Sequence, residues 1–198
     1  MKGTFVYIKV ALAALFIASL AHADTSPKAA IQDTLERVLA VTRTFNSQQD
    51  FIDNKPKLRA IIIPRFDFTE MARRSLGADW SRLAGREQEF VDTFIQFAEA
   101  SYTNALGTYR GEKMIYGREV IDNDAAEVHT SVVGSSGEAT PIVYMMRRVG
   151  ADWKVYDVVI DDVSLTSNFR SQFARILKND SIDGLMAKLR AKAQVVRG

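Results

Sequence analysis

The sequence predicts an α+β fold, in which a four-stranded antiparallel sheet is covered by helices, with an apolar cavity between the sheet and the helices. Three observations predict it. Apolar residues recur at helical spacing over residues 26–109 and again over 165–195. Residues 113–163 change to an alternation with a period of two, interrupted by short turns. Strands joined by short turns pair antiparallel, and a block of strands flanked by blocks of helices is typical of α+β proteins.

The first 23 residues have the pattern of an export signal. Lys2 and Lys9 supply positive charge, and the apolar run that follows is shorter than the ~20 residues needed to span a bilayer. Ala21-His22-Ala23 is a small-x-small cleavage site. We therefore expect a cleaved signal peptide over residues 1–23 and a single domain over 24–198. An uncleaved N-terminal anchor is the alternative.

Composition and charge exclude several classes of function. The chain has no cysteine, so disulfides, thiolate metal sites and a cysteine nucleophile are excluded. His129 is the one histidine outside the leader, and we expect no metal and no cofactor. Removing Lys2 and Lys9 leaves 24 of the 26 basic residues against 24 acidic ones, a net charge of zero. This balance argues against a nucleic-acid partner and against standing adsorption to an anionic membrane. An exported chain without cysteine fits a bacterial periplasm.

The expected helices have recognisable ends. Ser26 is a typical N-cap, and Pro27 suits the first helical position. Pro64 stops the second helix, while Gly77 and Gly111 end the third and fourth. The six expected helices cover residues 27–42, 50–63, 67–76, 85–109, 165–177 and 181–195.

Two of the four expected strands are apolar on both faces. The strands cover residues 113–122, 126–134, 140–149 and 152–163. An antiparallel sheet with one face in water alternates apolar and polar residues. Because the last two strands do not, each face must be covered by helices or must line a cavity. Asp161 and Asp162 point to opposite faces as strand neighbours, so a turn or a helix entry suits them better than acid–base chemistry.

We expect a cavity wall built from the long fourth helix, the last two strands and the start of the fifth helix. Its residues are Phe94, Phe97, Tyr102, Leu106, Ile142, Tyr144, Met146, Tyr156, Val158, Ile160 and Phe169. If the sheet faces the other way, Val143, Met145, Trp153 and Val155 replace the strand members. An aromatic stripe at helical spacing is more often part of a plain helical core than of a ligand site.

Several segments resemble one protein family. VYDVVIDDVSLTSNFRSQF (155–173) and FDFTEMARRSLGADW (66–80) closely resemble the two signatures of the MlaC family, also called toluene-tolerance proteins. Residues 87–109 and 182–185 resemble its long central and C-terminal helices. The sequence departs from the family at 160–162, where a glutamate–glycine step is common, and at Phe169, where tyrosine is common.

The resemblance implies a periplasmic phospholipid-binding carrier. Such a protein holds the acyl chains of its cargo in an apolar cavity and has no catalytic residues. It shuttles lipid between an outer-membrane lipoprotein complex and an inner-membrane ABC transporter complex with a substrate-binding ring, which maintains outer-membrane lipid asymmetry. A related branch is associated with hopanoid lipids, and these motifs do not separate the two branches.

Other roles remain as alternatives. A small pocket enzyme would need a buried carboxylate, and Asp157 beside Tyr156 is its candidate, although strand neighbours point to opposite faces. An adaptor without cargo would have a filled interior.

Arg170 lies at the edge of the apolar face of the fifth helix. We expect it to pair with Asp157 or Asp161 and fix that helix to the sheet, in preference to meeting a lipid phosphate at the cavity mouth.

Overall fold

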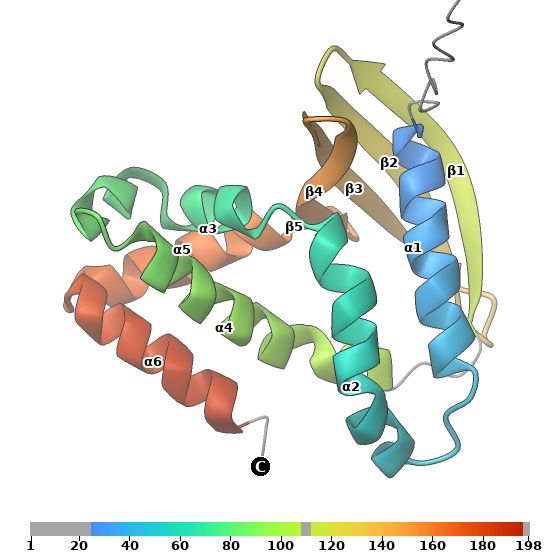
Figure 1. The fold of residues 1–198 in the computed structure, drawn as a ribbon, viewed down its shortest axis with the longest axis horizontal. Helices are drawn as coiled ribbons and strands as arrows, with labels where there is room; N and C mark the ends of the chain where they lie inside the picture. Colours follow the sequence, from blue (N-terminus) through green and yellow to red (C-terminus); the bar gives the residue numbers. More distant parts are fainter. Residues whose placement is uncertain (1–24, 108–111, 196–198) are drawn as a thin grey trace, which may run out of the picture.

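The computed structural model describes residues 25–107 and 112–195, except for the side chains of residues 48, 102–107 and 195. The expected signal peptide lies outside the described residues. Figure 1 shows a twisted sheet with α1 lying along it, while α3, α4, α5 and α6 are grouped at the other end of the molecule. The helices are α1 (Pro27–Thr42), α2 (Gln48–Ile62), α3 (Phe68–Leu76), α4 (Glu87–Gly107), α5 (Leu165–Leu177) and α6 (Ile182–Val195), with short 3-10 helices at Ile63–Arg65 and Gly77–Leu83.

Polar side chains cap the helices where the sequence predicts their ends. The Ser26 hydroxyl accepts a hydrogen bond from the Ala29 amide at the start of α1. Ser47 and Asp50 form a capping box at the start of α2. The side chain of Asp67 caps α3, and Gly77, with a φ of 61°, ends it. The predicted helices are thus confirmed, with α2 beginning two residues earlier and α4 beginning two residues later than expected. The expected end of α4 at Gly111 lies outside the described residues.

The sheet has five antiparallel strands in the order β1-β2-β3-β4-β5, one more than predicted. They are β1 (Lys113–Asp122), β2 (Ala125–Val133), β3 (Ala139–Val149), β4 (Asp152–Ile160) and β5 (Val163–Ser164). The extra strand arises because Asp161 and Asp162 have φ values of 48° and 62°. Two left-handed residues make a tight hairpin turn, which aspartate tolerates well. The chain therefore folds back and pairs Val163 with Ile160.

A β-bulge in β4 changes which residues share a face of the sheet. Met145 pairs with Asp157, but Met146 pairs with Val155, so Tyr156 is an extra residue without a partner of its own on β3. Trp153 and Val155 consequently lie on the same face as Val158. The prediction had placed them on opposite faces, because it assumed an unbroken alternation along the strand.

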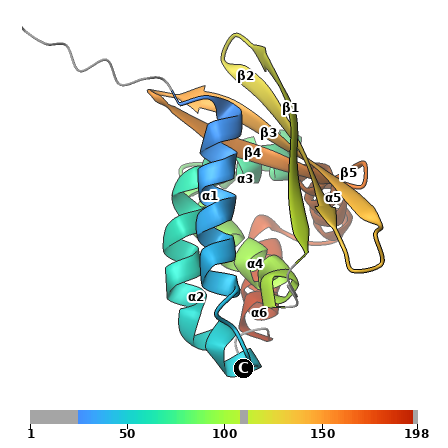
Figure 2. The ribbon, with the colours of Figure 1, turned by 90° about the vertical axis from the view of Figure 1, so that its right-hand side faces the viewer.

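The core has a sheet part, a helical part and a smaller part between α1 and α2. In the sheet part, α1 packs Ala30 and Ile31 against buried residues such as Val128. Figure 2 shows α1 along one face of the sheet and α2 beside α1. The opposite face keeps Val143 and Met145 only partly buried. The expectation that both faces of these strands are covered is therefore met in full on the α1 side, and only in part on the other.

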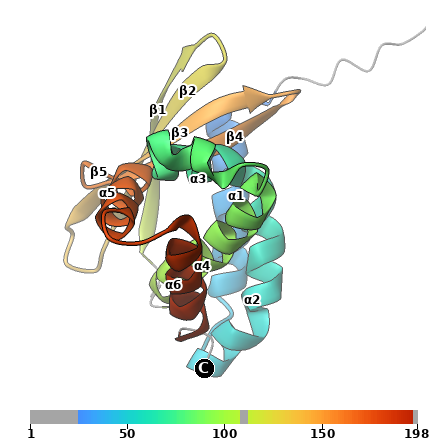
Figure 3. The same cartoon turned by 90° about the vertical axis from the view of Figure 1, so that its left-hand side faces the viewer.

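The helical part is formed by α3, α4, α5 and α6, which gather at the end of the molecule away from β1 (Figure 1) and face the viewer in Figure 3. Phe94 of α4 meets Phe169 edge to face at 5.5 Å between ring centroids, and Phe169 stacks on Phe173 at 5.9 Å. Such aromatic pairs stabilise a core by about 0.5–1.5 kcal/mol each beyond burial alone. The aromatic stripe of α4 therefore serves mainly as a helical core.

Candidate functional site

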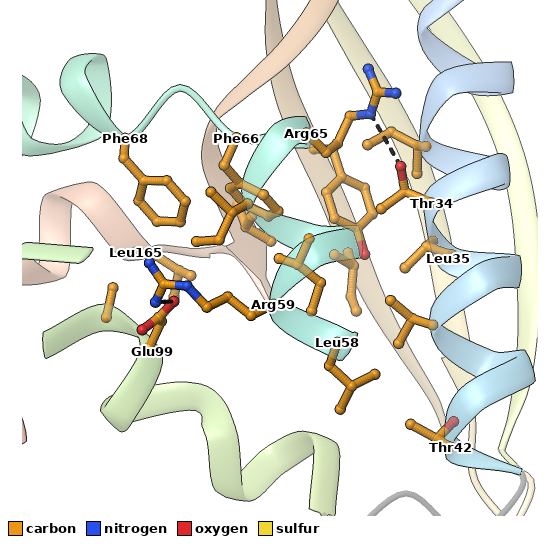
Figure 4. A pocket seen from close by; sticks show the side chains of 18 of the residues that line it. Thr34, Leu35, Thr42, Leu58, Arg59, Arg65, Phe66, Phe68, Glu99 and Leu165 are labelled. Atoms are coloured by element: carbon orange, nitrogen blue, oxygen red, sulfur yellow. Dashed lines mark hydrogen bonds and ion pairs between the residues drawn. The ribbon is translucent and has the colours of Figure 1, made fainter. Parts of the chain in front are cut away.

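A cavity of about 760 Å³ lies between the α1–α2 pair, one face of the sheet and the start of the helical core. Figure 4 shows apolar side chains from these elements pointing into it. From α1 and α2 it is lined by Ile31, Thr34, Leu35, Val38, Leu39, Thr42, Phe51, Lys55, Pro56, Leu58, Arg59 and Ile62. From the sheet it is lined by Met114, Val132, Ile142, Tyr144, Val158 and Ile160. The remaining lining residues include Phe66, Phe68, Met71, Ala98, Glu99, Glu112, Leu165 and Phe169.

The cavity exists because α2 is not packed on the sheet. Buried residues of α2, among them Phe51 and Leu58, pack with Val38 and Val41 of α1 and form a small core of their own. The first part of α1 is tied to the sheet, where the Lys28 amide donates a hydrogen bond of 2.9 Å to Glu119 of β1. The space left between the α1–α2 pair and the sheet is an apolar chamber.

A few polar groups line this chamber, and their hydrogen bonds stay within the protein. Arg65 donates from Nη1 to the Trp153 carbonyl oxygen at 2.7 Å and from Nε to the Thr34 hydroxyl at 3.1 Å. Arg59 of α2 forms an ion pair with Glu99 of α4. The pairs Arg65–Thr34 and Arg59–Glu99 are drawn in Figure 4.

Tyr144 places a buried hydroxyl group in the wall of the chamber. Burial raises the pKa of Tyr144 well above its usual range, and the nearby Tyr116 acts in the same direction, while a hydrogen bond with Thr130 opposes them. The phenol therefore stays protonated and neutral at physiological pH. A neutral hydroxyl is compatible with an apolar occupant.

The structure brings part of the predicted wall together. Ile142, Tyr144, Val158, Ile160 and Phe169 line the cavity. Their side chains come from β3, β4 and α5, three elements that the sequence predicts. The side chains of Tyr102 and Leu106 lie outside the described residues.

Other predicted wall residues lie elsewhere. Phe94 and Phe97 are fully buried in the helical core, because the inner turns of α4 face α5 and α6. Met146 lies on the cavity side of the sheet but is covered by α1. Tyr156, displaced by the bulge, lies under the guanidinium of Arg74 at 4.1 Å from the ring centroid. None of these four is among the lining residues.

The inverted arrangement does not supply the wall either. Trp153 and Val155 are buried in the sheet core, and Val143 and Met145 lie on the other face. The sequence analysis missed the contribution of α1 and α2. The spacing of Ile31, Leu35 and Val38 marked an amphipathic helix, but nothing local showed that its apolar face borders a space.

Asp157 and Arg170 do not pair with one another. The buried Asp157 carboxylate accepts hydrogen bonds from the Thr166 amide at 3.0 Å and the Ser164 hydroxyl at 2.5 Å, and so anchors the first turn of α5. Arg170 donates from Nε to the carbonyl oxygen of Arg74 at 2.8 Å. The expected pairing with Asp157 or Asp161 is therefore wrong. The carboxylate is taken by the helix start, and the arginine reaches the end of α3, where carbonyl groups lack helical partners.

Within residues 25–107 and 112–195, no three histidine or acidic side chains come together in an arrangement able to hold a metal ion. In that same part of the chain, no helix combines the length and the apolar character required to cross a membrane.

Comparison with known proteins places this geometry in a family. The model of the family described as "MlaC protein" matches residues 32–191. The chain is 26% identical over 204 residues to the intermembrane phospholipid transport system binding protein MlaC of Haemophilus influenzae, covering 98% of this chain and 94% of that one. It is 27% identical over 169 residues to the toluene tolerance protein ttg2D of Pseudomonas putida, covering 83% and 79%.

The fold also matches a solved structure. A phospholipid-binding protein from Ralstonia solanacearum, solved in complex with a phospholipid, superposes with a TM-score of 0.74 at 24% identity, covering 86% of this chain and 98% of that one. The fold, with its sheet, helices and intervening cavity, and the family match over most of the sequence agree with the resemblance found in the two signatures. The chain belongs to the MlaC family.

Proposed function

We propose that this protein is a non-enzymatic carrier that holds a phospholipid with its acyl chains in the cavity between the α1–α2 pair and the sheet. The single observation that carries the proposal is an almost wholly apolar cavity of about 760 Å³ in a chain of this family. At roughly 30 Å³ for a water-sized group, that volume takes about 25 methylene-sized groups. This is more than one acyl chain of ordinary length.

The energetics suit a carrier. Burying one methylene group stabilises a complex by about 0.8 kcal/mol, so one chain of roughly 16 carbons gains on the order of 12 kcal/mol. A bilayer offers the same chain a similar gain. Transfer is therefore nearly balanced, and docking to a donor or an acceptor decides its direction.

The names of the relatives support this role. The Haemophilus influenzae relative is described as the binding protein of an intermembrane phospholipid transport system. By analogy, this chain would be exported by a cleavable signal peptide and work in the periplasm, without a cofactor. It would carry lipid between an outer-membrane lipoprotein complex and an inner-membrane ABC transporter complex, and so maintain outer-membrane lipid asymmetry.

Two alternative roles fit the geometry less well. The pocket enzyme depended on Asp157, which lies outside the cavity lining and is held by Ser164 and Thr166. The adaptor required a filled interior, which the cavity argues against. A carrier of phospholipid is therefore the function that the geometry supports best.

Mass spectrometry of lipid that copurifies with the gently isolated mature protein tests the proposal. We expect a phospholipid, and a hopanoid in its place would assign the chain to the hopanoid-associated branch. Leu35→Trp, which fills the cavity from α1, should reduce the bound lipid. Ile176→Trp, at a half-buried site of α5 off the cavity, is the matched control and should retain it. Absence of copurified lipid together with absence of uptake from phospholipid vesicles would refute the carrier role.

A further inference from the structure

Two of the charged residues that line the cavity lie on α2, and both are basic. Lys55 and Arg59 both line it, and they lie one turn apart on α2, so their side chains project from the same face. Arg65 also lines the cavity, but two of its donors are taken by Trp153 and Thr34. Arg65 is thus committed to holding the fold, and Lys55 and Arg59 are the two other basic side chains of the lining.

These two cations differ in their partners. The ammonium group of Lys55 lies 5.5 Å from the ring centroid of Phe51, and among the described residues no carboxylate lies within ion-pair distance of it. Arg59 holds Glu99, which projects from α4 on the other side of the cavity (Figure 4). The side chain of Arg59 is 51% exposed, and that of Glu99 is 24% exposed. The ion pair thus lies where the apolar interior meets water.

That position is where the polar end of a chain-shaped guest emerges. A guest whose apolar part fills the cavity leaves its polar group at the boundary with water, beside α2 and α4. A guanidinium presents a planar fork that matches two phosphate oxygens, and a lysine ammonium adds a point charge. We propose that Lys55 and Arg59 form a subsite for the phosphate of a phospholipid headgroup, and that the phosphate takes the place of Glu99 on Arg59.

Exchange with Glu99 gives this subsite a moderate strength. Without a phosphate, Glu99 neutralises Arg59 and holds its side chain across the opening. When a phosphate binds, the Arg59–Glu99 contact is lost, and the like charges of phosphate and carboxylate repel. The net gain is therefore smaller than for an unopposed arginine, which suits a carrier that has to release its cargo.

The experiment compares two lipids that differ only in the phosphate-containing headgroup. Purified protein stripped of lipid is incubated with vesicles that contain phosphatidylglycerol, or diacylglycerol with the same acyl chains. Bound lipid per protein is then measured by mass spectrometry after gel filtration. Arg59→Gln and Lys55→Met should each reduce retention of phosphatidylglycerol by about three- to tenfold, the effect of losing one hydrogen bond of ordinary strength at a site open to water. Glu99→Gln should increase it, and retention of diacylglycerol should not change in any of the three.

A control variant and a second ligand distinguish a headgroup subsite from a purely structural ion pair and from a free-phosphate site. Arg37→Gln removes an exposed arginine of α1 that is not among the lining residues, and it should leave both lipids unaffected. Equal changes for the two lipids would overturn the subsite and indicate that the ion pair only holds α2 against α4. Binding of inorganic phosphate to the lipid-free protein by calorimetry, unaffected by bound diacylglycerol, would overturn it in favour of a free-phosphate site. The inference rests on the proposed function, but wild-type protein that takes up neither lipid refutes the carrier, whereas uptake that ignores Arg59 and Glu99 refutes the subsite alone.

Discussion

Arg170 of α5 donates a hydrogen bond of 2.8 Å from Nε to the carbonyl oxygen of Arg74, near the end of α3. The same Arg74 lies over the ring of Tyr156 and pairs with Glu70, so the two signature segments of the sequence meet at this point. Gly77 keeps the approach open, since a Cβ atom there would lie 3.4 Å from Nε of Arg170. The contact therefore connects α5 with α3 at a distance from the cavity.

Replacing Arg170 tests this connection. Arg170→Ala should lower the free energy of unfolding by about 1–2 kcal/mol, because it leaves a helix-end carbonyl without its partner and removes the packing of the arginine stem. Urea unfolding measures the loss, and bound lipid per folded protein should not change. Arg175→Ala on the same helix removes a hydrogen bond to the Ser171 carbonyl oxygen one turn away, and it should stay within about 0.5 kcal/mol of wild type. Loss of lipid without loss of stability would instead make Arg170 a headgroup contact.

Asp157 should matter for stability and not for cargo. Asp157→Ala should cost about 2–3 kcal/mol, because the Thr166 amide and the Ser164 hydroxyl lose a charged acceptor in a buried place. Asp162→Ala, at an exposed residue of the nearby turn, is a comparison in which only the backbone strain of a left-handed position is added. Thermal unfolding measures the loss of stability in each variant, and mass spectrometry of the bound lipid shows whether cargo binding is changed. Intact stability of the Asp157 variant would contradict the anchoring role.

Glu70 should make stability depend on pH. The pKa of Glu70 is lowered from its ordinary value, first because Arg73 donates hydrogen bonds to it and also because of Arg74, while burial opposes them. Because the pKa is lower in the folded protein, the carboxylate stabilises the fold fully at pH values above its ordinary pKa of 4.5. This contribution is lost as the pH falls through the folded pKa. Glu70→Gln should therefore cost about 1 kcal/mol at neutral pH, a modest amount because the arginines are half exposed.

Urea titrations near neutral pH and near the acid limit of stability check this sign. The difference between wild type and Glu70→Gln should narrow in acid, where the wild-type carboxyl takes up a proton. Glu138→Gln, in the exposed turn before β3, is the control. A difference that stays constant across the pH range would show that Glu70 acts through packing alone.

Substitutions of two phenylalanines distinguish a core residue from a residue that lines the cavity. Phe94→Ala should lower the free energy of unfolding by about 3–5 kcal/mol, because the ring is fully buried among the aromatic residues of α4 and α5. Lipid bound by the folded fraction should be unaffected. Phe68→Ala should cost less stability, since the ring is only half buried, but should reduce bound lipid because the ring lines the cavity. The reverse pattern would show that the aromatic stripe of α4 is the binding wall after all.

Local patterns in the sequence predicted most of the secondary structure. The bounds of α5 are those expected, because Ser164 as N-cap and the apolar spacing up to Leu177 are signals contained within the segment itself. β1 also has the bounds expected, and β2 and β3 differ from the prediction by one residue, because period-two alternation and short turns leave little choice of pairing. The tight turn at Asp161 and Asp162 was also suggested by residue type, but the return strand was too short to be recognised.

The cavity was decided by tertiary structure. Whether the apolar face of α1 or α4 borders a space or a neighbouring helix depends on distances between elements, and periodicity carries no information about those. Phe97 and Leu35 both belong to the apolar stripe of an amphipathic helix, yet the first is packed in the helical core and the second faces the cavity. The bulge at Tyr156 is a further case, since one extra residue exchanges the faces of a strand without changing its composition. The sequence by itself therefore determined which segments become helices and strands and which family they resemble. Only the packing of those elements decided where an apolar surface is left without a protein partner.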